Sequence, residues 1–419
     1  MEKRTVTGLI WVGPVFEASG YGTVSRACLV GLARIGFPVR AMNVGPDDRR
    51  LLDPRSCDEV SWLMHTDVGR SPAGLVHFTP DFYPRVRFKN VAKSIGYTIF
   101  ETDRIPGDWI KLCQGVDEMW LPSRFNYEAF VASGMDPARL RIFPYGVDTE
   151  FFRPVNERLD IEGRRGFCFL YVFPFDWRKG FDLLLEAYCR EFRAEDDVTL
   201  VLKTQSDQHV ARELERLILG RVADAGTGRK DLPRVIILTE PMDMMHLRQL
   251  YNSCDLYIST ERASGWGMPC MEAMAMGKPA AAIAWSGSTE FMREENSLLI
   301  KPTGRLVPVD ERLAEARPLY RGHRWAEVTE NEVRRVLRLA YEHRDVLAQA
   351  ARQGMQDVRE HYSHVRAAER MRDYLLSMTV TSWDAGRPHV RVRRPLGVKR
   401  ALQKASAMLR TRLTSTVRQ

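Results

Sequence analysis

Residues 256–277 read LYISTERASGWGMPCMEAMAMG, and this stretch decides the fold of the chain around it. The apolar run 256–259 predicts a buried strand. The segment from Pro269 to Met276 predicts a helix, because proline suits the first helical turn. Between them, Gly265 and Gly267 allow the backbone to approach a ligand closely. A strand, a glycine-rich turn and a helix in this order are typical of a parallel α/β fold.

The same alternation extends along most of the chain. In the second half, strands are expected at 167–173, 198–203, 235–239 and 280–284, and helices at 181–192, 209–220 and 243–252. In the first half, residues 7–43 read as strand, glycine-rich loop, helix and strand, and apolar runs follow at 75–78, 94–100, 119–121 and 141–143. Because β-hairpin signals such as Asn-Gly are missing from the alternating regions, both sheets should be parallel and doubly wound.

A polar, charged segment at 156–166 separates the two alternating regions and predicts a linker. We therefore expect an N-terminal Rossmann-like domain at 1–155 and a C-terminal one at 167–355. A helical segment at 356–378 should return to the first domain, and a basic tail follows at 379–419. Two doubly wound sheets that face each other place the ligand site in the central cleft.

Composition narrows the class of protein. With 419 residues, 44% of them hydrophobic, the chain has enough apolar mass for two cores. Its seven cysteines are scattered and odd in number, with no CxxC pair and no histidine cluster at ligand spacing, so we expect a reducing compartment and no metal site. The apolar run 6–12 is too short for a signal peptide, which favours a cytoplasmic location.

The net charge of +8 belongs to the tail. Residues 380–419 contain ten Arg or Lys against one acidic residue, Asp384, so residues 1–379 carry a net charge of about −1. A folded part that is nearly neutral does not indicate nucleic-acid binding. A helix from Leu396 would gather apolar residues roughly on one side, so we expect a membrane-surface contact through residues 387–418, peripheral at the inner face. A solvated extension is the alternative.

Several residues have the chemistry to bind a nucleoside diphosphate. The free amides at the helix start near Met268 favour a diphosphate, and Glu272, one turn later, could accept hydrogen bonds from a ribose diol. Arg178 and Lys179 lie beside Gly180 at another helix start, where they could neutralise the charge of a pyrophosphate leaving group. Plain solvated helix starts are the alternative for both segments.

Residues 264–277 resemble the donor-site signature of family 4 glycosyltransferases, E-G-F-G-L-P-x-x-E-A-M-A-x-G. Glu272 matches the second glutamate, and Ser264 stands where the first is expected. Residues 178–187 resemble the R-K-G-x-x-x-L-L-x-A segment of the same family. Shorter likenesses occur at 19–22, 144–148 and 286–290, so the resemblance covers about residues 8–378.

The resemblance implies the GT-B fold and the transfer of a hexose from a GDP- or UDP-linked donor to a glycan or lipid-linked acceptor. It implies retention of configuration through an oxocarbenium-like transition state. No Asp-x-Asp triplet occurs and no cofactor is implied, so we expect a metal-independent reaction in which Arg178 and Lys179 act as the cations. The expected donor contacts are Gly22, Lys203, Ser264, Gly265, Trp266, Gly267, Met268 and Glu272. In this family the first glutamate contacts sugar hydroxyls, and Glu261, three residues early, is not an obvious replacement for it.

The acceptor side is expected in the segment from Tyr97 to Pro106, just past a strand of the first domain. Glu101 is the candidate catalytic acid or base there, with Tyr97, Asp103 and Arg104 as acceptor contacts. Solvated loop residues are the alternative reading. For Lys203, at a strand end, a surface lysine is the alternative to a phosphate contact.

Two other functions remain open at this stage. Many members of the family that the chain resembles carry a histidine near the position of Glu101, and this chain does not. Together with Ser264, this leaves open a GT-B protein that binds a nucleotide sugar or glycan without transferring it. A two-lobed nucleotide-sugar epimerase shares the architecture, although the donor motifs do not support it.

Overall fold

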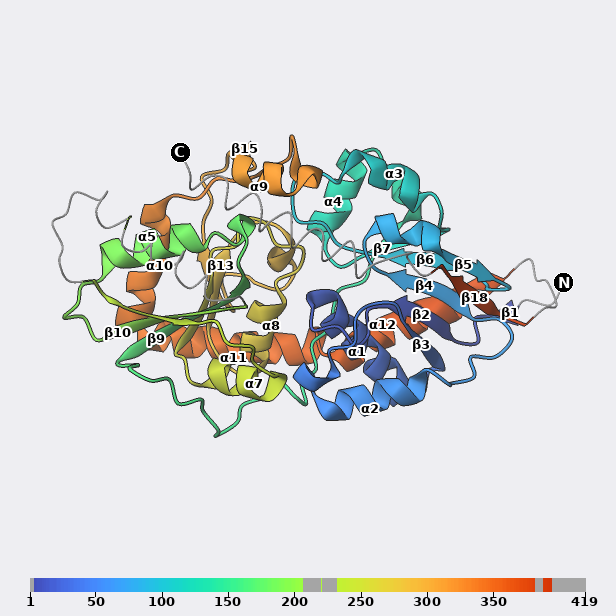
Figure 1. Ribbon diagram of the computed structural model, residues 1–419, viewed down its shortest axis with the longest axis horizontal. Helices are drawn as coiled ribbons and strands as arrows, with labels where there is room; N and C mark the ends of the chain where they lie inside the picture. Colours follow the sequence, from blue (N-terminus) through green and yellow to red (C-terminus); the bar gives the residue numbers. More distant parts are fainter. Residues whose placement is uncertain (1–3, 206–219, 221–231, 381–386, 394–419) are drawn as a thin grey trace, which may run out of the picture.

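The computed structural model describes residues 4–205, 220, 232–380 and 387–393. It contains two α/β lobes that lie side by side (Figure 1), each built on a six-stranded sheet. Most of the helix expected at 209–220 and the whole tail from Leu396 lie outside these residues. In the part of the chain that is described, no helix has the length and apolar character needed to cross a membrane.

The first-lobe sheet has the strand order β3-β2-β4-β6-β7-β8, and every neighbouring pair is parallel. Its strands are short and largely buried, as their apolar sequences require. They are β2 (Leu9–Gly13), β3 (Val39–Asn43), β4 (Ala73–His77), β6 (Ser94–Tyr97), β7 (Glu118–Leu121) and β8 (Leu140–Ile142). The flanking helices are α1 (Gly20–Arg34), α2 (Pro54–Leu63), α3 (Gly107–Cys113) and α4 (Arg124–Ala132).

The second-lobe sheet also has six parallel strands, in the order β11-β10-β9-β12-β13-β14. Its strands are β9 (Phe167–Pro174), β10 (Val198–Gln205), β11 (Arg234–Leu238), β12 (Leu256–Ser259), β13 (Ala280–Ile283) and β14 (Leu298–Ile300). The helices around it are α5 (Phe181–Glu191), α7 (Met244–Asn252), α8 (Met268–Ala275), α10 (Glu330–Glu342) and α11 (Arg344–His361). The order of both sheets is that of a doubly wound fold, in which ligands bind beyond the carboxyl ends of the strands.

Three antiparallel pairs lie outside the two main sheets and were not predicted. They are β1 (Arg4–Thr5) with β17 (Thr379–Val380), β5 (Val86–Lys89) with β18 (His389–Val392), and β15 (Leu306–Pro308) with β16 (Arg324–Ala326). The first two pairs join segments about 300 residues or more apart in sequence. Local sequence patterns carry no information about such pairing, which explains why the sequence predicts no strand in the tail.

The chain returns to the first lobe after the second is complete. Helix α12 (His364–Ser377) packs against α1, and the contact is so close that a Cβ atom built on Gly31 would lie 2.4 Å from the carbonyl oxygen of His364. In Figure 1 the orange helices α11 and α12 run along one side of both lobes. The two lobes are therefore joined by packing as well as by the linker.

The lobes also touch where their sheets face each other. The Thr102 hydroxyl lies 2.6 Å from Nδ1 of His323, and Arg324 forms an ion pair with Asp103 at 3.2 Å. The carboxylate of Glu290 accepts a hydrogen bond from the backbone N–H of Arg124, at the start of α4. These contacts surround the edge at which the predicted functional residues lie.

Candidate donor and transfer site

The cation pair Arg178–Lys179 lies in a single 3₁₀ turn (Trp177–Lys179) between β9 and α5. Asp176 starts the turn by accepting a hydrogen bond from the N–H of Arg178 at 2.9 Å. Gly180 ends it in the left-handed conformation, with φ 64°, and a Cβ atom there would lie 2.1 Å from the carbonyl oxygen of Thr260. Only glycine fits this position without strain, so the turn fixes both cations beside the end of β12.

Glu261 accepts hydrogen bonds from both cations, a role that the sequence reading missed. Nζ of Lys179 donates to Oε1 at 2.5 Å, and Nη1 of Arg178 donates to the same oxygen. All three side chains are at least 85% buried. Glu261 directly follows the carboxyl end of β12, and that position was the available signal, because such ends face the ligand site in parallel sheets.

The electrostatics of this cluster act differently on its three side chains. Burial alone would raise the pKa of Glu261, but the charges of Lys179 and Arg178 hold it below its usual value. Burial lowers the pKa of Lys179, and the charge of Glu261 only partly offsets this. For Arg178, the nearby acids Glu101 and Glu261 outweigh burial and hold its pKa well above the usual value.

Glu101 reaches the same cluster from the first lobe. Its Oε1 lies 3.7 Å from Nη2 of Arg178, and its Oε2 accepts a hydrogen bond from the Tyr320 hydroxyl at 2.9 Å. The structure thus brings together the three residues predicted as catalytic, Arg178, Lys179 and Glu101, with Arg178 in contact with the carboxylates of both Glu101 and Glu261. Their roles in a reaction stay predictions.

The glycine-rich turn before α8 lies next to this cluster and is held by a neighbouring loop. The N–H of Ser264 donates to Oγ of Ser286 at 2.9 Å, and the N–H of Gly287 donates to the carbonyl oxygen of Ser264 at 2.8 Å. Ser286 has φ 72° and ψ −157°, a region that non-glycine residues avoid. Strain of this kind persists only where surrounding contacts enforce it, and it is common at ligand sites.

The two glycines of this turn, Gly265 and Gly267, are required for different reasons. Gly267 has φ 99° and directly precedes α8, whose first residue is the buried Met268. A Cβ atom on Gly265 would lie 2.5 Å from Cδ1 of Ile99, so Gly265 lets the two lobes approach each other.

Glu272, predicted to bind a ribose diol, is buried on α8. Its Oε2 accepts a hydrogen bond from the Tyr251 hydroxyl at 2.7 Å. Burial raises its pKa to about 7, so the carboxyl group is half protonated near neutral pH. A buried carboxyl group with one oxygen held in place is suited to hydrogen bonding with hydroxyl groups, and the predicted role remains open.

Two donor-site predictions are corrected by the geometry, and a third, Gly22, stays a prediction. Trp266 is core: it is 2% exposed, and its ring contacts Tyr145, Phe291 and Tyr362. Lys203 is neither a phosphate contact nor a surface lysine, because its buried Nζ donates to the carbonyl oxygens of Thr204 and Glu240, both at 2.9 Å. Gly22 lies in the first turn of α1, where a Cβ atom would lie 2.1 Å from the carbonyl oxygen of Glu17. The positions of Trp266 and Lys203 follow from packing against residues distant in sequence, which a sequence motif does not show.

The acceptor-side predictions are corrected too. Tyr97 is fully buried among aromatic rings, and its hydroxyl donates to the carbonyl oxygen of Phe143 at 2.5 Å, so it cannot contact an acceptor. Asp103 is engaged with Arg104 at 2.9 Å and Arg324 at 3.2 Å, and so belongs to the contact between the lobes. Only Glu101, among the acceptor-side and catalytic candidates of this segment, lies against the cation pair.

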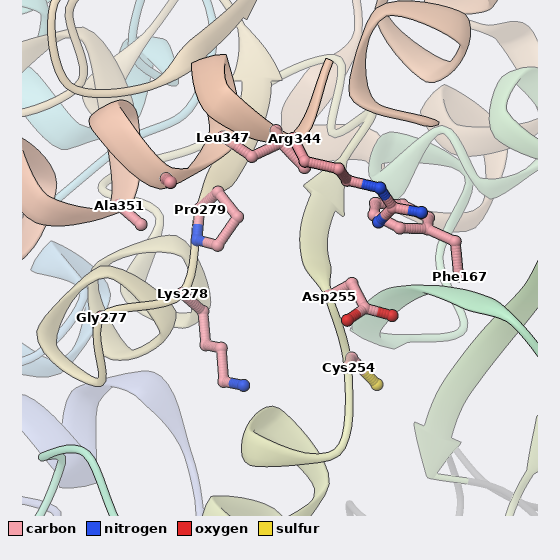
Figure 2. A pocket seen from close by; sticks show the side chains of 10 residues that line it. Phe167, Cys254, Asp255, Gly277, Lys278, Pro279, Arg344, Leu347 and Ala351 are labelled. Atoms are coloured by element: carbon pink, nitrogen blue, oxygen red, sulfur yellow. The ribbon is translucent and has the colours of Figure 1, made fainter. Parts of the chain in front are cut away.

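A pocket in the second lobe lies away from this site. Figure 2 shows it between Lys278, Asp255 and Arg344, with Phe167 and Cys254 at its wall. Its lining includes Phe167, the first residue of β9, and Asp255 and Pro279, which directly precede β12 and β13. The cation pair and Glu261, by contrast, follow the opposite ends of β9 and β12. The pocket is therefore separate from the site described above. Among the described residues, no group of three or more His, Cys, Asp or Glu side chains is arranged to hold a metal ion.

Comparison with known proteins places the site in a recognised domain. Residues 166–316, which include Arg178, Lys179, Glu261 and Glu272, match the family model "Glycosyl transferases group 1". The D-inositol 3-phosphate glycosyltransferase of Geodermatophilus obscurus is 29% identical over 177 residues, covering 38% of this chain and 36% of that protein. D-inositol 3-phosphate glycosyltransferase 2 of Catenulispora acidiphila is 26% identical over 297 residues, covering 68% of this chain and 65% of that protein. The matches thus span about one third to two thirds of these relatives.

Solved structures share the whole fold. HepE from Anabaena, in complex with UDP and glucose, has a TM-score of 0.58 at 14% identity and covers 89% of this chain and 100% of its own. Sucrose-phosphate synthase from Thermosynechococcus elongatus has a TM-score of 0.61 at 16% identity and covers 88% of this chain and 98% of its own. The predicted GT-B fold, two Rossmann-like lobes around a cleft, is confirmed.

Proposed function

We propose that this chain is a glycosyltransferase that transfers a hexose from a nucleoside-diphosphate sugar to a glycan or lipid-linked acceptor, without a metal ion. One observation carries the proposal: Arg178 and Lys179 are fixed, buried and adjacent at the carboxyl edge of the second-lobe sheet. Two cations in this position can stabilise the negative charge that develops on a departing diphosphate. The UDP bound in HepE supports a uridine nucleotide as the first donor to test.

In this proposal Glu261 holds the cation pair until the donor arrives. The diphosphate replaces the carboxylate as the partner of Arg178 and Lys179, and Glu101 approaches the reacting sugar from the first lobe. Because the site offers a carboxylate on each side of the cations and no separate nucleophile is assigned, the protein contributes positioning and electrostatic stabilisation. Retention of the anomeric configuration, expected from the resemblance, is part of the proposal.

Release of nucleotide from a panel of UDP- and GDP-hexoses tests the proposal, with wild type compared with Arg178→Ala. The variant should lose about 100-fold or more in kcat/KM, because a stabilising group for the leaving charge is gone. Arg352→Ala, at an exposed position on α11, is the matched control and should retain wild-type turnover. Wild-type turnover in Arg178→Ala would remove this residue from the mechanism.

A second candidate, a GT-B protein that binds the nucleotide sugar without transferring it, is favoured by one feature. Glu261 already serves as the hydrogen-bond acceptor of both cations, and Ser264 offers no carboxylate. Thermal stabilisation by a nucleotide sugar without any release of nucleotide, in the presence of candidate acceptors, would support this alternative. The absence of both binding and turnover would contradict both functions.

A further inference from the structure

The antiparallel pair β5–β18 forms a narrow surface at the outer end of the first lobe, here called the basic ribbon. It consists of residues 85–89 and 387–393. Two hydrogen bonds add to the strand pairing. Nδ2 of Asn90 donates to the carbonyl oxygen of Arg387 at 3.0 Å, and the N–H of Arg393 donates to the carbonyl oxygen of Arg85 at 2.9 Å. The C-terminal segment is thus bound to the lobe along its length. Figure 1 shows β5 and β18 at the end of the first lobe farthest from the second lobe.

One face of the ribbon is anchored to the lobe. The ring of Phe88 lies so close to β4 that a Cβ atom on Gly74 would be 2.4 Å from it, and Val390, opposite Phe88, is half-buried. Because side chains alternate along a strand, the residues between these apolar ones point outward.

The outward face is basic and unpaired. Arg391 lies opposite Arg87, and His389 lies opposite Lys89, and all four are exposed. Like charges directly opposite each other destabilise an antiparallel pair. Arg85, Arg387 and Arg393 extend the exposed charge at the ends. None of these side chains has an ion pair within the described structure, and the sequence has no Asp or Glu at 82–93 or 385–419.

An anionic partner would offset this repulsion. We propose that the basic ribbon docks on a membrane surface that contains anionic phospholipids. Basic residues close to such a surface each contribute to binding through the surface potential. The inference concerns a surface remote from the donor site and holds whether or not the chain transfers sugar.

The sequence beyond the ribbon favours a bilayer over a nucleic acid. After Arg393 the chain continues for 26 residues with seven Arg or Lys and no acid. Apolar residues recur among these charges, at Val398, Leu402, Leu409 and Leu413. A mixture of basic and apolar residues suits the boundary between headgroups and acyl chains, whereas recognition of a phosphate backbone needs only the charges.

Vesicle sedimentation with the full chain tests the proposal, using phosphatidylcholine vesicles with and without phosphatidylglycerol. The variant is Lys89→Glu with Arg391→Glu. Arg391→Glu sets an acid opposite Arg87, so the strand pair should remain folded while the surface loses charge. The matched control is Arg352→Glu with Arg359→Glu, two exposed arginines on α11 with the same change in charge.

Wild type and control should bind the anionic vesicles alike and neutral vesicles weakly. The ribbon variant should bind anionic vesicles about tenfold more weakly or worse, at a melting temperature no lower than that of wild type. Wild-type affinity in the ribbon variant, or equal binding to neutral vesicles, would overturn the proposal. So would a duplex DNA competitor that strips the wild type from vesicles at equal phosphate concentration, because the surface would then be a nucleic-acid site.

Discussion

At the scale of single residues, the most informative one is Glu261. A carboxylate that accepts from both Arg178 and Lys179 offsets part of the positive charge of two groups that would each be costly to bury alone. The same carboxylate must give way when a diphosphate binds the pair. The proposed function therefore predicts that stability without ligand and affinity for the donor are coupled at this residue.

Glu261→Gln should lower the free energy of unfolding by about 3 kcal/mol, because two buried cations lose their counter-charge. UDP should restore the charge, so it should raise the melting temperature of the variant by more than that of wild type. Thermal shift with and without UDP measures both effects. Glu360→Gln, exposed on α11, is the control. Equal UDP shifts in wild type and Glu261→Gln would show that the diphosphate does not replace this carboxylate.

Glu272 gives a prediction about pH. Its folded-state pKa is raised to about 7 from an ordinary value of 4.5, so the native state keeps a proton that the unfolded chain releases. This contribution to stability is complete below pH 4.5 and is lost as the pH rises through 7, on the order of 3 kcal/mol in all. Glu272→Gln, which stays neutral, should gain stability relative to wild type between pH 5 and pH 8. Urea unfolding at both pH values measures the gain, and a difference that does not change with pH would contradict the assignment.

At the scale of elements, the site depends on how two βα connections meet. The turn after β9 carries the cations, and the turn after β12 carries Glu261 and the glycine-rich segment. Arg262 joins them, because it forms two 2.8 Å hydrogen bonds with the carboxylate of Asp182 on α5. Each turn is local in sequence, but their alignment depends on the neighbouring, parallel positions of β9 and β12.

Gly180→Ala should disturb the alignment of the turns that follow β9 and β12. Gly180 has positive φ and no room for a Cβ atom, whereas Gly304 has φ 85° with nothing within 4 Å. Gly304→Ala should therefore lower the free energy of unfolding by about 1 kcal/mol, through backbone strain alone. Gly180→Ala should lower it by about 2 kcal/mol more, because the turn must also move away from Thr260. Denaturant unfolding compares the two variants. Equal losses of stability would mean that the contact with Thr260 does not constrain the turn.

At the scale of the whole molecule, the return of α12 to the first lobe makes the two lobes interdependent. The first lobe is completed by a helix that the chain forms after the second lobe. Contacts such as Thr102 with His323 add to this connection at the cleft. The relative position of Glu101 and Arg178 rests on all of these contacts.

Gly31→Ala tests this dependence, because the added methyl group would lie 2.4 Å from the carbonyl oxygen of His364. Displacement of α12 from α1 should lower the free energy of unfolding by about 1–3 kcal/mol and make the unfolding of the two lobes less cooperative. Gly20→Ala, in the same helix with open space around it, is the control and should change stability little. Calorimetry should show one transition in wild type and the control, and a broader or split one in Gly31→Ala. A single sharp transition at the wild-type temperature would show that the lobes do not depend on this contact.

The sequence by itself determined the local parts of this protein. The strand at 256–259 and the helix and glycine turn after it were predicted within one residue of their observed bounds, because hydrophobic period, proline and glycine act over a few residues. For the same reason the chain could be read as two parallel α/β lobes, with Arg178 and Lys179 at a helix start.

Only the tertiary structure decided which side chains meet. Trp266 and Tyr97 belong to the core, and Lys203 is buried and bonded to backbone carbonyl oxygens. Glu261 is the shared hydrogen-bond acceptor of Arg178 and Lys179. The pairing of β18 with β5, about 300 residues apart in sequence, gathers charges that the sequence shows only as separate segments. Burial, ion pairing and strand partnership depend on residues distant in sequence, and folding fixes them when the two sheets and the returning helix pack together.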